Sequence, residues 1–374
     1  MKICMITSYP PDKCGVSDYS ERLVKELRKI GQQVMIISRQ GKGIRGEKNT
    51  TRLIATKRVE RSLMQAVEEF RNLGRAISDA DKSTAAIKEF SPDVVHVQYE
   101  PGLYNLFFLP ILLSRLKELG IKSVITLHGM DYFPLNIFHR AAVYGKPGRI
   151  IVHTRRHYES LKAELPHGQT KKIRIVPMGL MKGKKAKGGN HILFFGFLNQ
   201  HKGVEDLLQA FAGAGVKENL LMVGSINPAY RPDVEYKDKI QDLIRTLGAE
   251  DRVKFIYQFV PRKKLENYIK NSMFVVFPYR SSYSGGQSQA ILDALAFGKP
   301  LIITRPAQGN LTDNENAVVI NPGNIGELTE AIRKLSRSSG LRKRLSSNNR
   351  KLAARLGWKN IARATLGIYE SMLI

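Results

Sequence analysis

Short apolar runs alternate with amphipathic segments along most of this chain, an order typical of parallel α/β proteins. The first apolar run predicts a strand over residues 2–8, and a loop and an amphipathic segment follow it. The amphipathic segment predicts a helix that Ser17 or Asp18 caps, and the next strand is predicted over residues 33–38. A strand, loop, helix and strand in this order predict the opening of a doubly wound sheet.

This pattern restarts once along the chain. Residues 181–190 are basic and glycine-rich, have no apolar periodicity, and are predicted to form a flexible linker. Beyond them the strand pattern resumes at His191. We therefore expect an α/β protein of two doubly wound domains, residues 1–180 and 191–356, facing each other across a cleft. A terminal helix over about residues 357–374 is expected to cross back to the first domain.

Membrane and export signals are weak in this sequence. The longest apolar run, residues 106–113, is shorter than the roughly 20 residues that a membrane span needs. The helix predicted over residues 106–119 either packs in the core or dips into a membrane surface. The chain starts directly in a strand and has two cysteines, Cys4 and Cys14, too few for a disulfide framework. These features predict a cytoplasmic protein.

The charge is strongly basic, with 60 Lys and Arg residues, 33 Asp and Glu residues and a net charge of +27. No acidic residue lies between Glu330 and Glu370. Such a surface attracts polyanions, so an anionic membrane face, a phosphorylated substrate or nucleic acid is a candidate partner, although solubility explains the charge equally well. The sequence has no RNA-binding, zinc-finger or helix-turn-helix pattern, and we expect no nucleic-acid partner.

The stretch from Phe277 to Thr304 has the most specific chemistry. It predicts the end of a buried strand, a serine- and glycine-rich turn, a helix over about residues 288–297 and a further strand. Backbone N–H groups and the helix dipole at such a turn favour a phosphate, and Asp293 could accept hydrogen bonds from ribose hydroxyls. A plain βα crossover capped by small residues is the alternative, and this stretch alone leaves both interpretations open.

Six motifs occur in one order: the Gly15 loop, PDVVHVQ, TLHG, VPMG, GFLNQHKG and GGQSQAILDALAFGKP. Their order and spacing over essentially the whole chain resemble the GT-B-fold glycosyltransferases of the retaining family 4. The resemblance implies transfer of a hexose from a GDP- or UDP-linked sugar to a glycan, lipid-linked or phosphorylated acceptor, without a cofactor or metal. It is also consistent with a peripheral position on the inner face of the membrane.

The resemblance assigns roles to particular residues. Lys202 matches the lysine that pairs with the donor diphosphate, and His128 matches the histidine on the acceptor side, so these two are the catalytic candidates. Asp293 stands where the family has the ribose-binding second glutamate of E-x7-E. The donor-binding candidates are Gly15, Gly196, Asn199, Lys202, Arg280, Gly286, Gln287, Ser288, Gln289 and Asp293. The acceptor-binding candidates are Glu100, His128 and Asp131. No metal ligand is expected.

The sequence departs from the family pattern at two positions. Gly285 replaces the first glutamate of E-x7-E, and Phe197 stands where an arginine often assists the lysine. An alternative function is therefore a catalytically impaired GT-B protein that binds a nucleotide or glycan. His153 and His157 are four residues apart but lack the H-E-x-x-H pattern, so we do not expect them to bind zinc.

Overall fold

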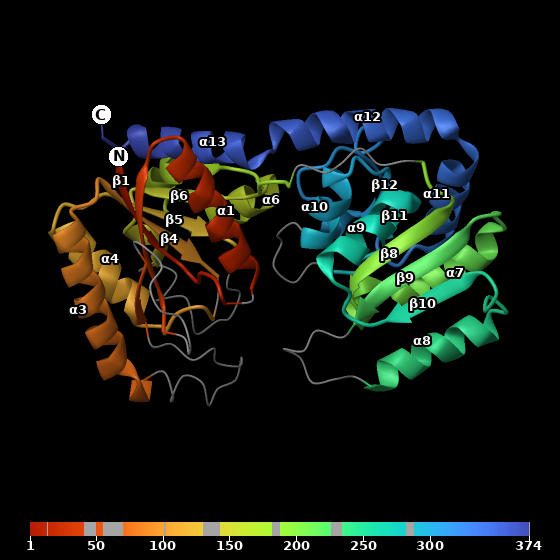
Figure 1. Cartoon of the computed structure of the whole chain (residues 1–374), viewed down its shortest axis with the longest axis horizontal. Helices are drawn as coiled ribbons and strands as arrows, with labels where there is room; N and C mark the ends of the chain where they lie inside the picture. Colours follow the sequence, from red (N-terminus) through yellow and green to blue (C-terminus); the bar gives the residue numbers. More distant parts are fainter. Residues whose placement is uncertain are drawn as a thin grey trace. The chain divides into compact units, whose positions relative to one another are not determined.

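The computed structural model describes residues 1–12, 14–40, 50–54, 70–100, 102–129, 143–181, 188–225, 234–281 and 288–373. The chain forms two compact units (Figure 1). The first unit contains Met1–Gly179 and Trp358–Ile374, and the second contains Leu180–Gly357.

The first unit is built on a parallel sheet with the strand order β3-β2-β1-β4-β5-β6-β7. Its strands are β1 (Lys2–Ile6), β2 (Gln33–Arg39), β3 (Thr50–Ile54), β4 (Val94–Tyr99), β5 (Ser123–Leu127), β6 (Arg149–Val152) and β7 (Ile173–Ile175). Its helices are α1 (Gly15–Lys29), α3 (Leu73–Phe90), α4 (Phe108–Glu118), α6 (Arg155–Glu164), the 3-10 helix η2 (His167–Lys172) and α13 (Trp358–Glu370). The chain order reverses between β1 and β4, where ligands bind in doubly wound sheets.

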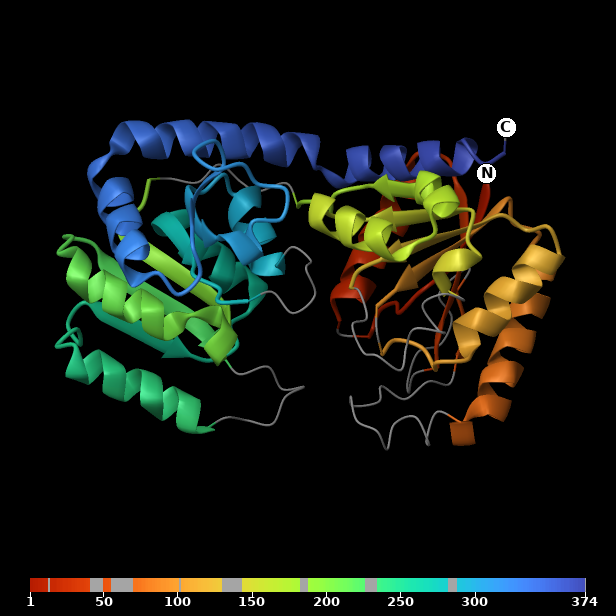
Figure 2. The ribbon, with the colours of Figure 1, turned by 180° about the vertical axis from the view of Figure 1, so that it is seen from behind.

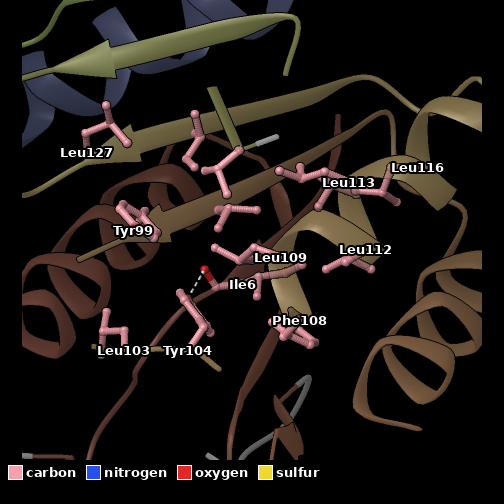
Figure 3. Close-up of a cluster of buried hydrophobic side chains, with 14 of the residues drawn as sticks. Ile6, Tyr99, Leu103, Tyr104, Phe108, Leu109, Leu112, Leu113, Leu116 and Leu127 are labelled. Atoms are coloured by element: carbon pink, nitrogen blue, oxygen red, sulfur yellow. Dashed lines mark hydrogen bonds between the residues drawn. The ribbon is translucent and has the colours of Figure 1, made fainter. Parts of the chain in front are cut away.

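Side chains alternate between the two faces of this sheet. Cys4 and Ile6 of β1 share a buried cluster with α3 and α4, and Figure 2 shows these two helices together on one flank. Figure 3 shows the α4 side chains Phe108, Leu109, Leu112, Leu113 and Leu116 in this cluster, where the Tyr104 hydroxyl donates to the Ile6 carbonyl. The apolar face of α4 is therefore core.

The opposite face of the first sheet is covered by two helices from the two ends of the chain. Helices α1 and α13 pack against each other. His96 of β4 contacts Tyr369 of α13. Because side chains alternate along a strand, His96 and Gln98 lie on the same face, away from α3 and α4.

The start of α1 differs from the prediction that Ser17 or Asp18 caps it. Cys14 is the N-cap, with an extended backbone and its Sγ accepting from the Ser17 N–H at 3.4 Å. Ser17 is buried inside the helix, and Asp18 lies in the first turn, where its charge complements the helix dipole. Gly15 is consequently the first helical residue and not part of the preceding loop.

The second unit has a parallel sheet with the order β10-β9-β8-β11-β12-β13. Its strands are β8 (His191–Phe197), β9 (Asn219–Ser225), β10 (Val253–Tyr257), β11 (Ser272–Phe277), β12 (Leu301–Thr304) and β13 (Ala317–Ile320). Its helices are η3 (Gln200–Lys202), α7 (Val204–Ala214), α8 (Val234–Thr246), α9 (Arg262–Asn271), α10 (Gln289–Ala296), η4 (Arg305–Ala307), α11 (Ile325–Arg337) and α12 (Ser339–Arg355). The order reverses between β8 and β11, so the predicted fold of two doubly wound parallel sheets is confirmed.

Residues 182–187 of the predicted linker lie outside the described residues. Near its end, a Cβ on Gly189 would lie 1.7 Å from the Asn271 carbonyl oxygen, so this position packs tightly against the end of α9. Of the helices within the described ranges, none is both long and apolar enough to cross a membrane.

Candidate functional site

The carboxyl ends of β8 and β11 place several of the predicted residues together in the second unit. Asn199 and Lys202 follow β8, and Tyr279 and Arg280 follow β11. The Lys202 ammonium lies over the Tyr279 ring, 3.7 Å from its centroid. The Arg280 N–H donates to the His201 carbonyl at 2.8 Å, which joins the two loops. This edge of the sheet is therefore a compact polar site.

Lys202 is a cation of this site that pairs with no carboxylate among the described residues. Burial lowers the pKa of its ammonium from 10.5 to about 8. None of the ion pairs between residues that the structure describes includes Lys202. A partly desolvated ammonium beside an aromatic face gains free energy from a bound anion, because no carboxylate of the described residues offsets its lost hydration.

The start of α10 lies beside Lys202 and Tyr279. The hydroxyls of Tyr279 and Ser288 are 3.2 Å apart, and Ser288 is the residue that precedes α10. A Cβ on Gly196, whose φ is +142°, would lie 4.0 Å from the Tyr279 hydroxyl and 3.9 Å from the Ala290 Cβ. The structure thus brings Gly196, Lys202 and Ser288 to one helix N-terminus, as an anion site requires.

Asn199 contributes a further polar atom to this edge. Its Oδ1 is buried and has no hydrogen-bond partner among the described residues. Gly286 and Gln287, which were also predicted to bind the donor, lie outside the described residues, as does Gly285.

Asp293 is buried on α10 and is already held by two side chains. Arg262, the first residue of α9, donates Nη1–H to Asp293 Oδ2 at 2.6 Å. Gln289 donates Nε2–H to Asp293 Oδ1 at 3.0 Å. Sequence reasoning missed Arg262, because no spacing rule connects the start of α9 with the middle of α10. Each carboxylate oxygen keeps lone-pair capacity for a second hydrogen bond.

Arg280, a donor-binding candidate of the sequence, pairs with a carboxylate of the protein itself. Its guanidinium donates Nε–H and Nη2–H to the two oxygens of Asp206 on α7, at 2.9 and 2.6 Å. This bidentate pair raises the pKa of Arg280. Because Asp206 neutralises the charge, we infer that Arg280 supports the site and contributes less than Lys202 to anion binding.

His128 follows β5 in the first unit, and its backbone N–H donates to the Tyr99 carbonyl at 2.8 Å. Its ring Nε2 lies 2.8 Å from Oε1 of Gln98, and its Nδ1 lies 3.2 Å from Nε2 of His153. The Tyr19 ring packs against the His128 ring in a T-shaped arrangement, with the centroids 4.6 Å apart. Burial, with His153, His96 and His157 nearby, lowers the pKa of His128 well below 6.5.

These contacts extend into a histidine column, which we define as Tyr369, His96, Gln98, His128, His153 and the Val176 carbonyl. His153 Nδ1 lies 2.8 Å from the Val176 oxygen, and His96 Nδ1 lies 2.5 Å from the Tyr369 hydroxyl. The Gln98 amide nitrogen lies 3.2 Å from His96 Nε2. The available sequence signal was a histidine and a glutamine two residues apart in an otherwise apolar strand.

The remaining predicted residues are separate from these two groups. A Cβ on Gly129 would lie 2.9 Å from Glu100 Oε1, so the Glu100 carboxylate rests against the residue after His128. Gly15 is exposed at the start of α1, with no atom within 4 Å of an added Cβ. Asp131 lies outside the described residues. Within the described part of the chain, no group of three or more His, Cys, Asp or Glu side chains could hold a metal ion.

Two doubly wound sheets in one chain, with a lysine and a helix start at the switch point of the second sheet, are typical of GT-B proteins. Residues 14–180 match the family Glycosyltransferase Family 4, and residues 181–352 match Glycosyl transferases group 1. The chain therefore belongs to the GT-B glycosyltransferases of family 4, and the predicted family is confirmed. The absence of the first E-x7-E glutamate remains a sequence observation.

Known proteins resemble the chain at low identity. Alpha-D-kanosaminyltransferase of Streptomyces kanamyceticus is 24% identical over 298 residues, which is 71% of this chain and 74% of that protein. Sucrose-phosphate synthase of Thermosynechococcus elongatus has a TM-score of 0.74 at 17% identity, covering 100% of this chain and 99% of its own. The Anabaena protein Alr3699/HepE in complex with UDP has a TM-score of 0.73 at 14% identity, covering 99% and 100%. At these identities the structural likeness shows the fold alone.

Proposed function

We propose that this glycosyltransferase moves a hexose from a UDP- or GDP-linked sugar to a hydroxyl of a glycan acceptor, with retention of the anomeric configuration. The observation that carries the proposal is the Lys202 ammonium, which lies over Tyr279 beside the start of α10 without a carboxylate partner among the described residues. A nucleoside diphosphate supplies the negative charge that this arrangement lacks.

The donor is held through its diphosphate and its ribose. Lys202 and the first N–H groups of α10 stabilise the charge that develops on the departing diphosphate. Asp293, oriented by Arg262 and Gln289, accepts from the ribose hydroxyls. Structures of the Anabaena protein with UDP and with UDP-glucose support a nucleotide-sugar donor of this kind.

The transfer step uses neither a metal nor a protein nucleophile in this proposal. The bond between the anomeric carbon and the diphosphate oxygen breaks, and the acceptor oxygen bonds to the same face of that carbon. The acceptor proton passes to the departing phosphate oxygen. His128 positions a hydroxyl of the donor sugar or of the acceptor, as the family resemblance implies.

The proposed acceptor is a lipid-linked or phosphorylated glycan, which the enzyme binds in the cytoplasm at an anionic membrane surface. The exposed cations of α12 support this proposal, namely Lys343, Arg344, Arg350, Lys351 and Arg355. Each cation near an anionic surface contributes about 1 kcal/mol of attraction. Both cysteines are free, consistent with a reducing compartment.

A catalytically impaired protein that binds a nucleotide or glycan is the second candidate. The pairing of Asp293 with Arg262 favours it, because a ribose must share the carboxylate with a guanidinium. Gly285 in place of the first E-x7-E glutamate favours it as well. This candidate predicts nucleotide binding without transfer of the sugar.

The first test is thermal unfolding with UDP, GDP, UDP-glucose and GDP-mannose, followed by radiolabelled sugar transfer. Saturating donor should raise the Tm of the wild type by about 3 °C or more. Lys202→Ala should abolish the shift, and Lys254→Ala, which alters an exposed lysine on β10, should keep it. The transferase proposal fails if no nucleotide shifts the wild type, whereas a shift without transfer would favour the binding protein.

A further inference from the structure

In the histidine column, the Val176 carbonyl at one end determines which atom donates in each of the next hydrogen bonds. The Val176 carbonyl can only accept, so His153 Nδ1 carries the proton of their 2.8 Å hydrogen bond. A neutral His153 then accepts at Nε2. Its partner at 3.2 Å is His128 Nδ1, which must therefore donate. His128 is left with a lone pair on Nε2.

The Gln98 amide faces that lone pair at 2.8 Å. If the Gln98 amide oxygen faced His128 Nε2, two acceptors would meet unless Nε2 carried a proton. Because His128 Nδ1 already donates to His153, that proton would be an extra one and would make the ring a cation. A half-turn of the amide about its last bond places the nitrogen there and needs no extra proton. Burial and the neighbouring imidazoles lower the pKa of His128 well below 6.5, and these causes oppose the extra proton. We therefore place the amide N–H toward His128.

The rest of the column follows from this choice. The Gln98 oxygen now faces His96 Nε2, 3.2 Å away, so His96 carries its proton on Nε2 and shares it with Thr126 Oγ1 at 2.7 Å. The Tyr369 hydroxyl donates to His96 Nδ1 at 2.5 Å. Every bond then points from Tyr369 toward Val176, and hydrogen bonds aligned in this way polarise one another.

We propose that Gln98, His153 and Tyr369 are positioning residues that hold His128 neutral with its proton on Nδ1, so that Nε2 accepts from a hydroxyl of the substrate sugar in place of the Gln98 amide. The contact with a sugar rests on the proposed function, whereas the tautomer does not. Among the residues that the structure describes, the titratable groups around His128 include His96 of β4, Glu100 after β4, His153 after β6, His157 of α6, Tyr19 of α1 and, through His96, Tyr369 of α13.

The tautomer can be measured without any turnover. The full-length protein labelled with 15N-histidine gives ring-nitrogen NMR signals for its eight histidines, and His128→Gln identifies the signal of His128. The expected result from about pH 6 to pH 8 is a protonated Nδ1 and an unprotonated Nε2. A proton on Nε2 at pH 7, in the neutral or the cationic ring, overturns the proposal.

Kinetics test the positioning role once transfer has been detected. His153→Leu removes the acceptor for His128 Nδ1–H, whereas His153→Gln retains a side-chain oxygen that can accept. We expect His153→Leu to lower kcat/KM about 10- to 100-fold and His153→Gln to restore most of the loss. Tyr369→Phe should lower it less than His153→Leu, and Tyr158→Phe, a tyrosine outside the column, should have no effect.

The pH profile separates positioning from a merely structural effect. Protonation of His128 should not change wild-type kcat/KM between about pH 6 and pH 8. In His153→Leu burial still holds the pKa of His128 below 6.5, but the loss of the neighbouring imidazole should raise it, so activity should begin to fall at a higher pH than in the wild type. An equal loss at every pH would contradict the positioning role. The predicted tautomer in a protein that transfers no sugar would overturn the proposed function and leave the tautomer assignment standing.

Discussion

Arg262 donates to Asp293 across 2.6 Å, and this ion pair joins the first residue of α9 to the middle of α10. The Asp293 side chain is 7% exposed and the Arg262 side chain is 42% exposed. The buried carboxylate therefore depends on a partner that reaches it from the surface. In the proposed donor site, the pair sets the direction in which Asp293 presents its remaining lone pairs.

Replacing Arg262 should affect both stability and nucleotide binding. We expect Arg262→Met to destabilise the protein by about 1–2 kcal/mol, because it leaves a buried carboxylate with one fewer charged partner, although solvent screens the exposed guanidinium. Nucleotide affinity should fall roughly three- to tenfold as Asp293 loses its orientation. Denaturant titration and calorimetric binding measure the two effects. Arg245→Met, in an exposed pair with Asp242, is the matched control, and tighter nucleotide binding by Arg262→Met would show that arginine competes with ribose.

Lys202 should couple nucleotide binding to proton uptake. Its pKa is about 8, and a bound diphosphate should raise it toward 10.5. At pH 8 about half of the protein molecules should therefore take up a proton when nucleotide binds, and affinity should weaken as the pH rises above 8. Calorimetry in buffers of different ionisation enthalpy measures this uptake. Lys202→Arg should remove it, and an unchanged proton uptake in that variant would assign the effect to another group.

The same lysine should make folding stability depend on pH. Its folded-state pKa of about 8 lies below the ordinary 10.5, so between these values the unfolded chain binds the proton and the folded chain does not. Stability therefore rises with pH across this window, because the unfolded state alone must lose that proton. Comparing urea midpoints of the wild type and Lys202→Met from about pH 7.5 to pH 10 isolates the contribution. Equal slopes for the two proteins would be inconsistent with the lowered pKa.

Gly203 should tolerate no side chain. It has φ +65°, and a Cβ there would lie 2.0 Å from the Pro278 carbonyl oxygen, so Gly203→Ala must displace the loop that carries Lys202. We expect a loss of more than about 2 kcal/mol and a large drop in nucleotide binding. Gly213 lies inside α7 with open space around it, so Gly213→Ala should be neutral or stabilising by up to about 1 kcal/mol. Equal stabilities of the two variants would refute the clash.

The cap of α1 offers a test of a weak acceptor. Cys14 accepts from Ser17 through sulfur at 3.4 Å, and a hydroxyl accepts such a bond more strongly than a thiol. Cys14→Ser should stabilise the protein by a few tenths of a kcal/mol, and Cys14→Ala should destabilise it by about 0.5–1 kcal/mol. Thermal unfolding of the two variants beside the wild type measures both effects. Identical Tm values for Ser and Ala would mean that the cap bond contributes nothing.

Most of the sheet strands were predictable because an apolar run is a local signal, whereas β3 (Thr50–Ile54) lies in a polar, basic stretch that gave no such signal. The apolar run at residues 94–98 predicts β4 from its own composition, and the restart at His191 predicts the second sheet. The histidine column was not predictable, since His96 and Tyr369 are 273 positions apart and His153 meets Val176 only once the strand order is known. Cys14 was missed because residue preferences favour Ser and Asp as caps. Arg262 and Asp206 were missed because their partners, Asp293 of α10 and Arg280 after β11, are distant in the sequence.

The return of α13 to the first unit has a consequence during synthesis. Residues 1–179 leave the ribosome before α13 is made, so His96 of β4 still lacks its partner Tyr369. The second unit is translated in between and has a complete sheet of its own. The second unit can therefore complete its fold before α13 of the first unit has been translated.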